Sequence, residues 1–271
     1  MVFRSRLLLG LILGFTTAAW PQNAADIAAI LNHDFQGKVL TQTHFLCGER
    51  VPYTADGKSP TAAIGSWTTC GQLRVKAVTL PDDHTIQIQG ERLTLIFKGD
   101  KPGFRPSNAG KVLIDIASSN VLDEAAARAA MANVFLGPQE HLSDYVPPYW
   151  RNFLLRREVA DGTRPKAELP PTLPANVSKV GGDTHPPKAI FTPDPDYGPS
   201  ARQGRYEGTI VLRLVVDETG KPRDIEISRP LGSGLDERAA LALATWKFSP
   251  AMRNGQPVAV QISVEINFRV Y

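Results

Sequence analysis

"PVAVQISVEINFRV", residues 257–270, alternates apolar and polar side chains over its whole length. The apolar positions are Val258, Val260, Ile262, Val264, Ile266, Phe268 and Val270. This period of two predicts a half-buried antiparallel strand with one face in the core and the other in water. At ~3.3 Å per residue the run would reach about 45 Å, whereas ordinary strands reach roughly 17–20 Å. We therefore expect this strand to extend beyond the sheet that it joins.

The residues before this run predict a hairpin and then a helix. Two alternating segments flank a glycine-containing turn at residues 218–221, which is typical of a β-hairpin. Their inward positions are Ile210, Leu212, Leu214 and Val216 on the first strand, and Ile225 and Ile227 on the second.

"GSGLDERAALALATWKF", residues 232–248, has the spacing of an amphipathic helix. Ser233 is the expected N-cap, with Asp236 three residues later at the capping-box position. The apolar face comprises Leu235, Ala239, Leu243 and Trp246. The order of hairpin, helix and long strand predicts a small α+β domain in which the helix packs on an antiparallel sheet.

The first part of the chain predicts a β-rich domain with flanking helices. Residues 24–32 have helical spacing, and residues 37–116 contain short segments rich in branched side chains between Gly, Pro and Asp. The strand segments are residues 37–47, 73–80, 84–90, 92–99 and 111–116. A helix with Asn120 as N-cap and Asp123 at its capping-box position follows, and helical pattern continues to about Glu158.

Prolines crowd the segment from Asp161 to Pro199. They are Pro165, Pro170, Pro171, Pro174, Pro186, Pro187, Pro193, Pro195 and Pro199. Because proline fixes φ and removes a backbone donor, we expect a semi-rigid spacer rather than packed structure. The predicted organisation is a first domain over residues 23–160, a linker over 161–186 and a second domain over 187–271.

The N-terminal "MVFRSRLLLGLILGFTTAAW", residues 1–20, combines Arg4 and Arg6 with an apolar stretch and a small-residue cleavage pattern at Thr17 and Ala19. This composition favours a secretory signal peptide. The alternative is an uncleaved inner-membrane anchor, although residues 7–20 at ~1.5 Å each reach only about 21 Å of a ~30 Å hydrocarbon core. Either interpretation predicts an exported protein that functions in the periplasm.

Cys47 and Cys70 are the two cysteines of the chain. An oxidising compartment allows them to form a disulfide, and two buried free thiols are the alternative. Neither interpretation implies catalysis.

Charge and motif content argue against several function classes. The formal net charge of +3 falls to +1 without Arg4 and Arg6, which is too small for a nucleic-acid footprint. "GSGLD" lacks the third glycine of a phosphate-binding loop because Glu237 stands there, and no Gly-x-Ser-x-Gly motif is present. The histidines lack metal-site spacing: His33, His44, His84, His141 and His185. We expect a protein that is not an enzyme and has no cofactor or metal.

Residues 195–268 resemble the TonB C-terminal domain. The resemblance rests on the approach from Tyr197 to Ala201, Gly208, the "VDETG" turn, "GSGLD", "WKFSPA" and "GQPVAV", in this order. The segment from about residue 187 to residue 271 is thus identified as a TonB-like domain. The first domain is similar to one that precedes such modules in exported acidobacterial proteins, on Gly65, Trp67 and "PPYWRNFLL".

The resemblance implies a cell-envelope protein that binds peptides of TonB-dependent outer-membrane receptors by β-strand addition. It also implies transfer of proton-motive-force energy from an inner-membrane motor similar to ExbB/ExbD. The partner would pair along the exposed edge of the last strand. The residues expected to bind it are Val258, Val260, Gln261, Ile262, Ser263, Val264, Glu265, Ile266 and Asn267.

Two alternatives remain open from the sequence. The last strand can pair with a second copy of the chain and form a homodimer. The protein can also act as an uncoupled periplasmic interaction or dimerisation protein, in which the first domain binds an unknown envelope ligand.

Overall fold

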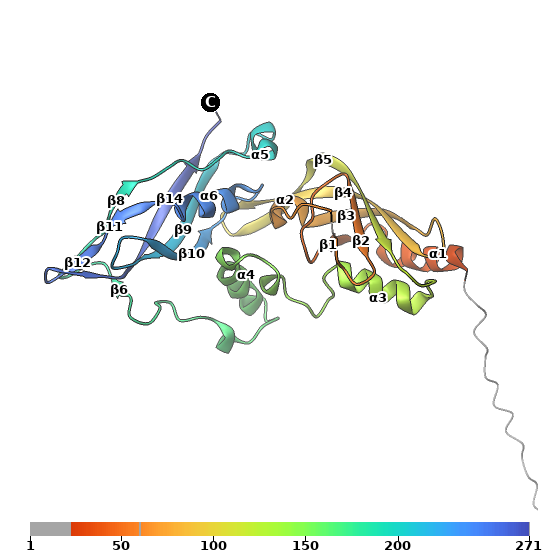
Figure 1. Ribbon diagram of the computed structural model, residues 1–271, viewed down its shortest axis with the longest axis horizontal. Helices are drawn as coiled ribbons and strands as arrows, with labels where there is room; N and C mark the ends of the chain where they lie inside the picture. The colour runs from red at the N-terminus through yellow and green to blue at the C-terminus, as the bar shows by residue number, and fades with distance from the viewer. Residues whose placement is uncertain (1–22, 60, 271) are drawn as a thin grey trace, which may run out of the picture.

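The computed structural model describes residues 23–59 and 61–270, so the predicted signal peptide or anchor lies outside the described residues (Figure 1). The described chain is α+β, as the sequence predicts. It contains two main sheets, which lie toward opposite ends of the molecule in Figure 1. Within the described residues, no helix combines the length and apolar character that crossing a bilayer requires.

The first sheet has the strand order β1-β3-β4-β5-β2. Its strands are β1 (Val39–Thr41), β2 (Arg50–Thr54), β3 (Gln72–Thr79), β4 (Thr85–Lys98) and β5 (Lys101–Ala117). The segments expected as two strands at residues 84–90 and 92–99 are one strand, β4, with a register shift between Glu91 and Leu93. Strand β2, which the sequence pattern did not indicate, pairs parallel with β5.

Two helices bury one face of the first sheet. They are α1 (Ala24–Phe35) and α3 (Glu124–Val134), and Ile27, Leu31 and Met131 from them join the core formed with the strands. The N-cap of α3 is Asp123, whose carboxylate accepts from the Ala126 amide at 2.7 Å, rather than Asn120 as the sequence suggested. The cap therefore lies three residues later than expected.

Cys47 and Cys70 form the predicted disulfide, with a Cα–Cα distance of 5.2 Å. Cys70 ends the short helix α2 (Trp67–Cys70). The buried guanidinium of Arg92 donates to the carbonyl of Leu46, at 2.9 Å, and to the carbonyl of Cys70. Arg92 therefore holds the loop that the disulfide closes. Burial lowers the pKa of Arg92 to about 10.

The second sheet has the order β10-β9-β14-β6. Its strands are β6 (Ser178–Lys179), β9 (Gly208–Val216), β10 (Pro222–Arg229) and β14 (Val260–Phe268). Helix α6 (Leu235–Leu243) packs on its apolar face through Ala239 and Leu243. Smaller sheets join β8 (Lys188–Phe191) to β11 (Lys247–Ser249), and β7 (Thr184–His185) and β13 (Gln256–Val258) to β12 (Ala251–Arg253).

The expected length of the last strand is wrong. The run of residues 257–270 is divided at Ala259, between β13 and β14, because Ala259 and Val260 are both buried and strict alternation fails there. Strand β14 pairs with β9 from Val260 opposite Val216 to Phe268 opposite Gly208. It therefore does not extend beyond its neighbour.

Two expectations about α6 also need correction. Its N-cap is Gly234, in the left-handed conformation, rather than Ser233. The helix ends at Leu243, so Trp246 lies after it instead of on its apolar face. The Asp236 carboxylate accepts from the amides of Leu231 and Gly232, which ties the preceding loop to the helix start.

The proline-rich segment is packed over part of its length, whereas a semi-rigid spacer without packed structure was expected. Strand β6 pairs parallel with β14, and β7 and β8 pair with β12 and β11. Val177 is 7% exposed and packs with Val215 and Ala259. The pairing residues lie between the prolines, which explains how this segment can join sheets. The boundaries at residues 160, 186 and 187 remain a proposal.

Helix α4 (Pro148–Ala160) connects the first part of the chain with the second sheet. Asn152 on α4 donates to Glu226 on β10 at 2.7 Å, and Arg213 on β9 donates to the same carboxylate at 2.9 Å. Glu226 alternates with the inward positions Ile225 and Ile227, so strand alternation places it on the surface, but it is only 8% exposed because α4 covers it. Further elements are α5 (Pro199–Gln203) and the 3-10 turns at Leu142–Asp144 and Lys166–Glu168.

We expect the double substitution Cys47→Ser and Cys70→Ser to lower the free energy of unfolding by roughly 3 kcal/mol, because the disulfide restricts the unfolded chain. Denaturant unfolding with and without reductant measures this. The unsubstituted protein should lose the same stability on reduction, while the double variant should not respond. Equal unfolding midpoints for the oxidised protein and the double variant would contradict the prediction.

Candidate partner-binding site

The edge of β14 opposite β9 is free over most of its length. Within the described residues, β6 pairs with β14 only at Val260 and Gln261, and no strand pairs with that edge from Ile262 to Phe268. Seven residues at ~3.3 Å each correspond to roughly 20 Å of edge. The open edge therefore arises from the end of β6, not from overhang past β9.

The direction of the free backbone groups follows from β6. The Ser178 amide donates to the Ala259 carbonyl at 2.9 Å, so Ala259 faces the β6 side. Along an extended strand, successive residues direct their N–H and C=O groups alternately to the two sides. Ser263, Glu265 and Asn267 consequently present their backbone donors and acceptors at the open edge, while the residues between them bond to β9.

The side chains beside this edge differ between the two faces of the sheet. Ile262 and Val264 are partly buried at the margin of the core, so their apolar surface can contact side chains of an added strand. On the opposite face, Glu265 lies 3.6 Å from Arg229, and Thr209 donates to Asn267 at 2.5 Å. At the end of the strand, the Tyr197 ring packs on Phe268 with centroids 5.5 Å apart.

The structure thus brings together most of the residues expected to bind a partner. Ile262, Ser263, Val264, Glu265, Ile266 and Asn267 lie along the open edge. Val260 and Gln261 are on β14 in the part that pairs with β6, and Val258 belongs to β13, which pairs with β12. Those three positions are already covered by other strands of this chain.

The first half of the chain, up to the end of α4, packs against the second half, which contains the second sheet and α6. This interface, called the seam below, was not predicted. The hairpin of β4 and β5 reaches the loop before α6, where the Phe97 amide donates to Leu231 at 3.0 Å and the Ser233 amide donates to Leu95 at 2.8 Å (Figure 1). A Cβ on Gly232, at φ +89°, would overlap the Leu95 carbonyl oxygen. The "GSGLD" segment is therefore a docking loop as well as a turn.

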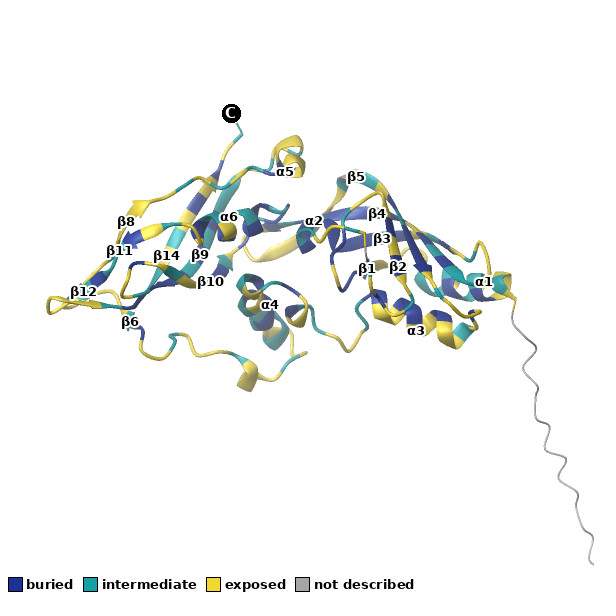
Figure 2. Ribbon diagram, in the orientation of Figure 1, coloured by how far each residue is buried: buried dark blue, intermediate teal, exposed yellow. Residues whose placement is uncertain are grey.

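A buried carboxyl group lies directly behind this loop. Glu237 Oε1 accepts from the Trp150 indole at 3.0 Å and from the Ser66 hydroxyl at 2.7 Å. Trp150 packs edge-on to Trp67, and Phe97 and Phe153 complete an aromatic cluster that continues into the α6 core. Figure 2 shows the buried residues continuing from α2 to α6. The two halves thus share one hydrophobic core.

Burial dominates the electrostatics of the seam. It raises the pKa of Asp236, with a further contribution from the adjacent Glu237, and it also raises the pKa of Glu237. Asp236 is completely buried and Glu237 is 8% exposed. Acidic residues at the start of a helix are usually interpreted as capping residues. The only signal of a buried contact in the sequence is Gly232, the first glycine of "GSGLD", close to the acidic residues.

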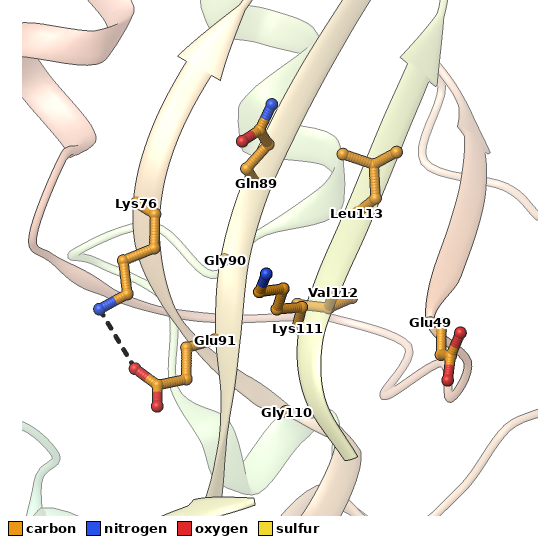
Figure 3. A pocket seen from close by; sticks show the side chains of 9 residues that line it. All are labelled: Glu49, Lys76, Gln89, Gly90, Glu91, Gly110, Lys111, Val112 and Leu113. Carbon is orange, nitrogen blue, oxygen red and sulfur yellow. Dashed lines mark ion pairs between the residues drawn. The ribbon is translucent and has the colours of Figure 1, made fainter.

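A separate hollow of about 910 Å³ lies on the outer face of the first sheet (Figure 3). Its side chains include Lys76, paired with Glu91 at 3.2 Å, together with Gln89 and Lys111. Glu49 lies apart from this pair in the same view. The charges are mixed and do not converge on one point, so this hollow does not indicate a ligand. In the described part of the chain, no group of His, Cys, Asp and Glu is placed to hold a metal.

The fold and the open strand define a class of protein module: a small α+β domain whose last strand has a free edge within the described residues. Residues 193–270 match the family described as the Gram-negative bacterial TonB protein C-terminal. This part of the chain is similar to the C-terminal domain of that family. The match is to a family of non-enzymatic proteins, in agreement with the sequence-based expectation.

Individual relatives match over the same region. Protein tonB2 of Pseudomonas aeruginosa is 33% identical over 82 residues, which are 30% of this chain and 30% of the relative. Protein TonB of Vibrio cholerae serotype O1 is 34% identical over 77 residues, 28% of this chain and 32% of the relative. The chain thus spans about a third of the length of these curated relatives. The solution structure of the Pseudomonas aeruginosa TonB C-terminal domain is 23% identical, with 34% of this chain and 90% of that one covered and a TM-score of 0.28.

Gly232→Ala should destabilise the protein more than Gly255→Ala, by roughly 1–3 kcal/mol, because a methyl group at Gly232 meets the β4 backbone. Gly255 is a matched control: its φ is +79°, but a Cβ there has open space. Thermal unfolding measures both variants. Equal losses would mean that the Gly232 contact does not hold the seam.

The raised pKa of Glu237 predicts that stability falls as the pH rises. The folded protein keeps a proton that the unfolded chain has lost, so stability is greatest below the ordinary value of 4.5 and declines as the pH passes through the raised pKa. Glu237→Gln preserves the acceptor for Trp150 and Ser66 but cannot ionise. Unfolding free energies measured from pH 4 upward should decline less for this variant than for the unsubstituted protein. Parallel pH profiles would contradict the prediction.

Proposed function

We propose that this chain is a TonB-like cell-envelope protein whose C-terminal domain binds an extended peptide of an outer-membrane receptor by strand addition to β14. The observation that carries the proposal is that, among the residues the structure describes, no strand pairs with the edge of β14 from Ile262 to Phe268, while its other edge is fully paired with β9. Backbone hydrogen bonds would supply affinity, and the partly buried Ile262 and Val264 would supply selectivity.

The family match supports a function in energy transduction for outer-membrane transport. In this proposal, an inner-membrane motor similar to ExbB/ExbD provides the energy, and the N-terminal segment either anchors the chain beside that motor or is removed on export. An uncoupled periplasmic interaction protein would use the same edge without the motor. Determining the mature N-terminus and its retention in inner-membrane fractions separates these two versions.

Homodimerisation is the competing use of the open edge. A second copy of β14 can satisfy the same backbone groups as a receptor peptide, because strand pairing requires no particular side chain. Sedimentation of the purified protein over a range of concentrations, with and without peptide, distinguishes the two. Peptide binding by a monomer supports receptor capture, while a dimer that peptide cannot dissociate supports the alternative.

Glu265→Pro should weaken binding of a peptide derived from a TonB-dependent receptor by roughly tenfold or more, because it removes a donor at the open edge. The ladder to β9 should be spared, since Glu265 faces away from it. Glu265→Ala is the matched control: it removes the same side chain and keeps the amide.

Calorimetric titration of both variants with the same peptide measures the effect, and circular dichroism checks their folding. The proposal requires Glu265→Ala to bind nearly as well as the unsubstituted protein. Unchanged affinity of a folded Glu265→Pro variant would contradict strand addition at this edge.

A further inference from the structure

Strand β6 occupies the same edge of β14 that the proposed receptor peptide would use. It pairs in parallel with β14 at Ser178, opposite Val260, and at Lys179, opposite Gln261. The Ser178 amide donates to the Ala259 carbonyl at 2.9 Å. Because β6 and a partner peptide need the same backbone groups, they compete for this part of β14.

The chain that leads to β6 has few packing contacts. Residues 169–176, called the strap below, connect the 3-10 turn Lys166–Glu168 to the segment that contains β6 (Figure 1). None of the residues of the strap is buried. A cavity of about 680 Å³ lies between the strap, at Pro171 and Pro174, and the side chains of Arg151 and Asn152 on α4. Moving most of the strap would therefore not disturb buried residues.

A single buried side chain next to β6 attaches it to the sheet. Val177 is 7% exposed and packs with Val215 and Ala259, and the partly buried Leu173 packs against this group. This small cluster is separate from the larger core that contains α6. The contacts that hold β6 are thus the short pairing with β14 and this cluster, and its release would leave the larger core intact.

Both ends of the segment around β6 are fixed to the rest of the chain. Before the strap, Arg164 forms ion pairs with Asp144, Glu158 and Glu168. After β6, strand β7 pairs with β12. A released β6 would remain tethered between these two points, so its effective concentration near β14 would stay high and it would pair again when a partner leaves.

We propose, building on the proposed receptor-binding function, that β6 is a detachable strand that covers the start of the β14 edge and is displaced by a longer partner peptide. With β6 in place, Ser263, Glu265 and Asn267 present their backbone groups to a partner. Without β6, Ala259 and Gln261 present theirs as well, because alternate residues of a strand face the same side. A longer peptide would gain this pairing while the pairing with β6 is lost.

Amide hydrogen exchange of the full chain tests whether β6 detaches. The Ser178 amide bonds to β14, whereas the amides of Ile262 and Val264 face β9. If β6 detaches by local opening, the Ser178 amide should exchange roughly tenfold or more faster than those two amides, after correction for intrinsic rates. A smaller difference would overturn the proposal, because β6 would then open only together with the sheet.

Ser178→Pro should favour the detached state, because proline cannot donate the hydrogen bond to Ala259. Lys179→Pro is the matched control, since the amide of the next residue along a strand points to the opposite side, away from β14. Circular dichroism checks that both variants fold.

The two variants would be titrated calorimetrically with a peptide derived from a TonB-dependent receptor, prepared in two lengths. The shorter has about seven residues, the length of the free edge, and the longer has about three more at each end. The longer peptide should bind Ser178→Pro about tenfold more tightly than Lys179→Pro, because it no longer has to displace β6. The shorter peptide should bind the two variants nearly equally.

Equal binding of the longer peptide by the two folded variants would overturn the proposal. An equal gain for both peptide lengths in Ser178→Pro would also contradict it, because the effect would then not arise from the part of the edge that β6 covers. If neither peptide binds any variant, the proposed receptor-binding function fails, while hydrogen exchange still decides whether β6 detaches. The two failures are thus separately observable.

Discussion

The close approach of two backbones at Gly232 is the constraint on which the arrangement of this protein depends. The β4–β5 hairpin extends out of the first sheet and bonds to residues 231–233, just before α6. Any side chain at Gly232 would overlap β4, so the contact requires glycine there. Directly behind it, Glu237 joins α6 to Trp150 and Ser66, which fixes the second sheet relative to the first.

The contacts at the seam show that the two parts of the protein pack against each other and are not connected by a spacer alone. Trp67, Phe97 and Trp150 from the first half share a core with Leu235 and Ala239 from the second. The proline-rich segment is held along the second sheet by β6, β7 and β8. The first half therefore supports the C-terminal domain directly, and its attachment leaves the edge of β14 free.

The same packing decides which part of β14 is available. Strand β6 covers Val260 and Gln261, and the chain then turns at Gly181 and Gly182 toward β12. Within the described residues, the free edge of β14 consequently begins at Ile262. The limit comes from a segment that is remote in sequence, and it explains why three of the residues expected to bind a partner are already paired.

The sequence by itself determined the order of hairpin, helix and last strand in the C-terminal domain, and it indicated the disulfide between Cys47 and Cys70 that the structure contains. Alternation, turn residues and cysteine number act over short distances or on few candidates, so each can be interpreted without coordinates. Only the tertiary structure decided where β14 begins, that Glu226 and Glu237 are buried, and that "GSGLD" docks on β4. Those features depend on contacts between residues more than seventy positions apart, such as Asn152 with Glu226 and Trp150 with Glu237. The local pattern of apolar and polar side chains does not predict such long-range contacts.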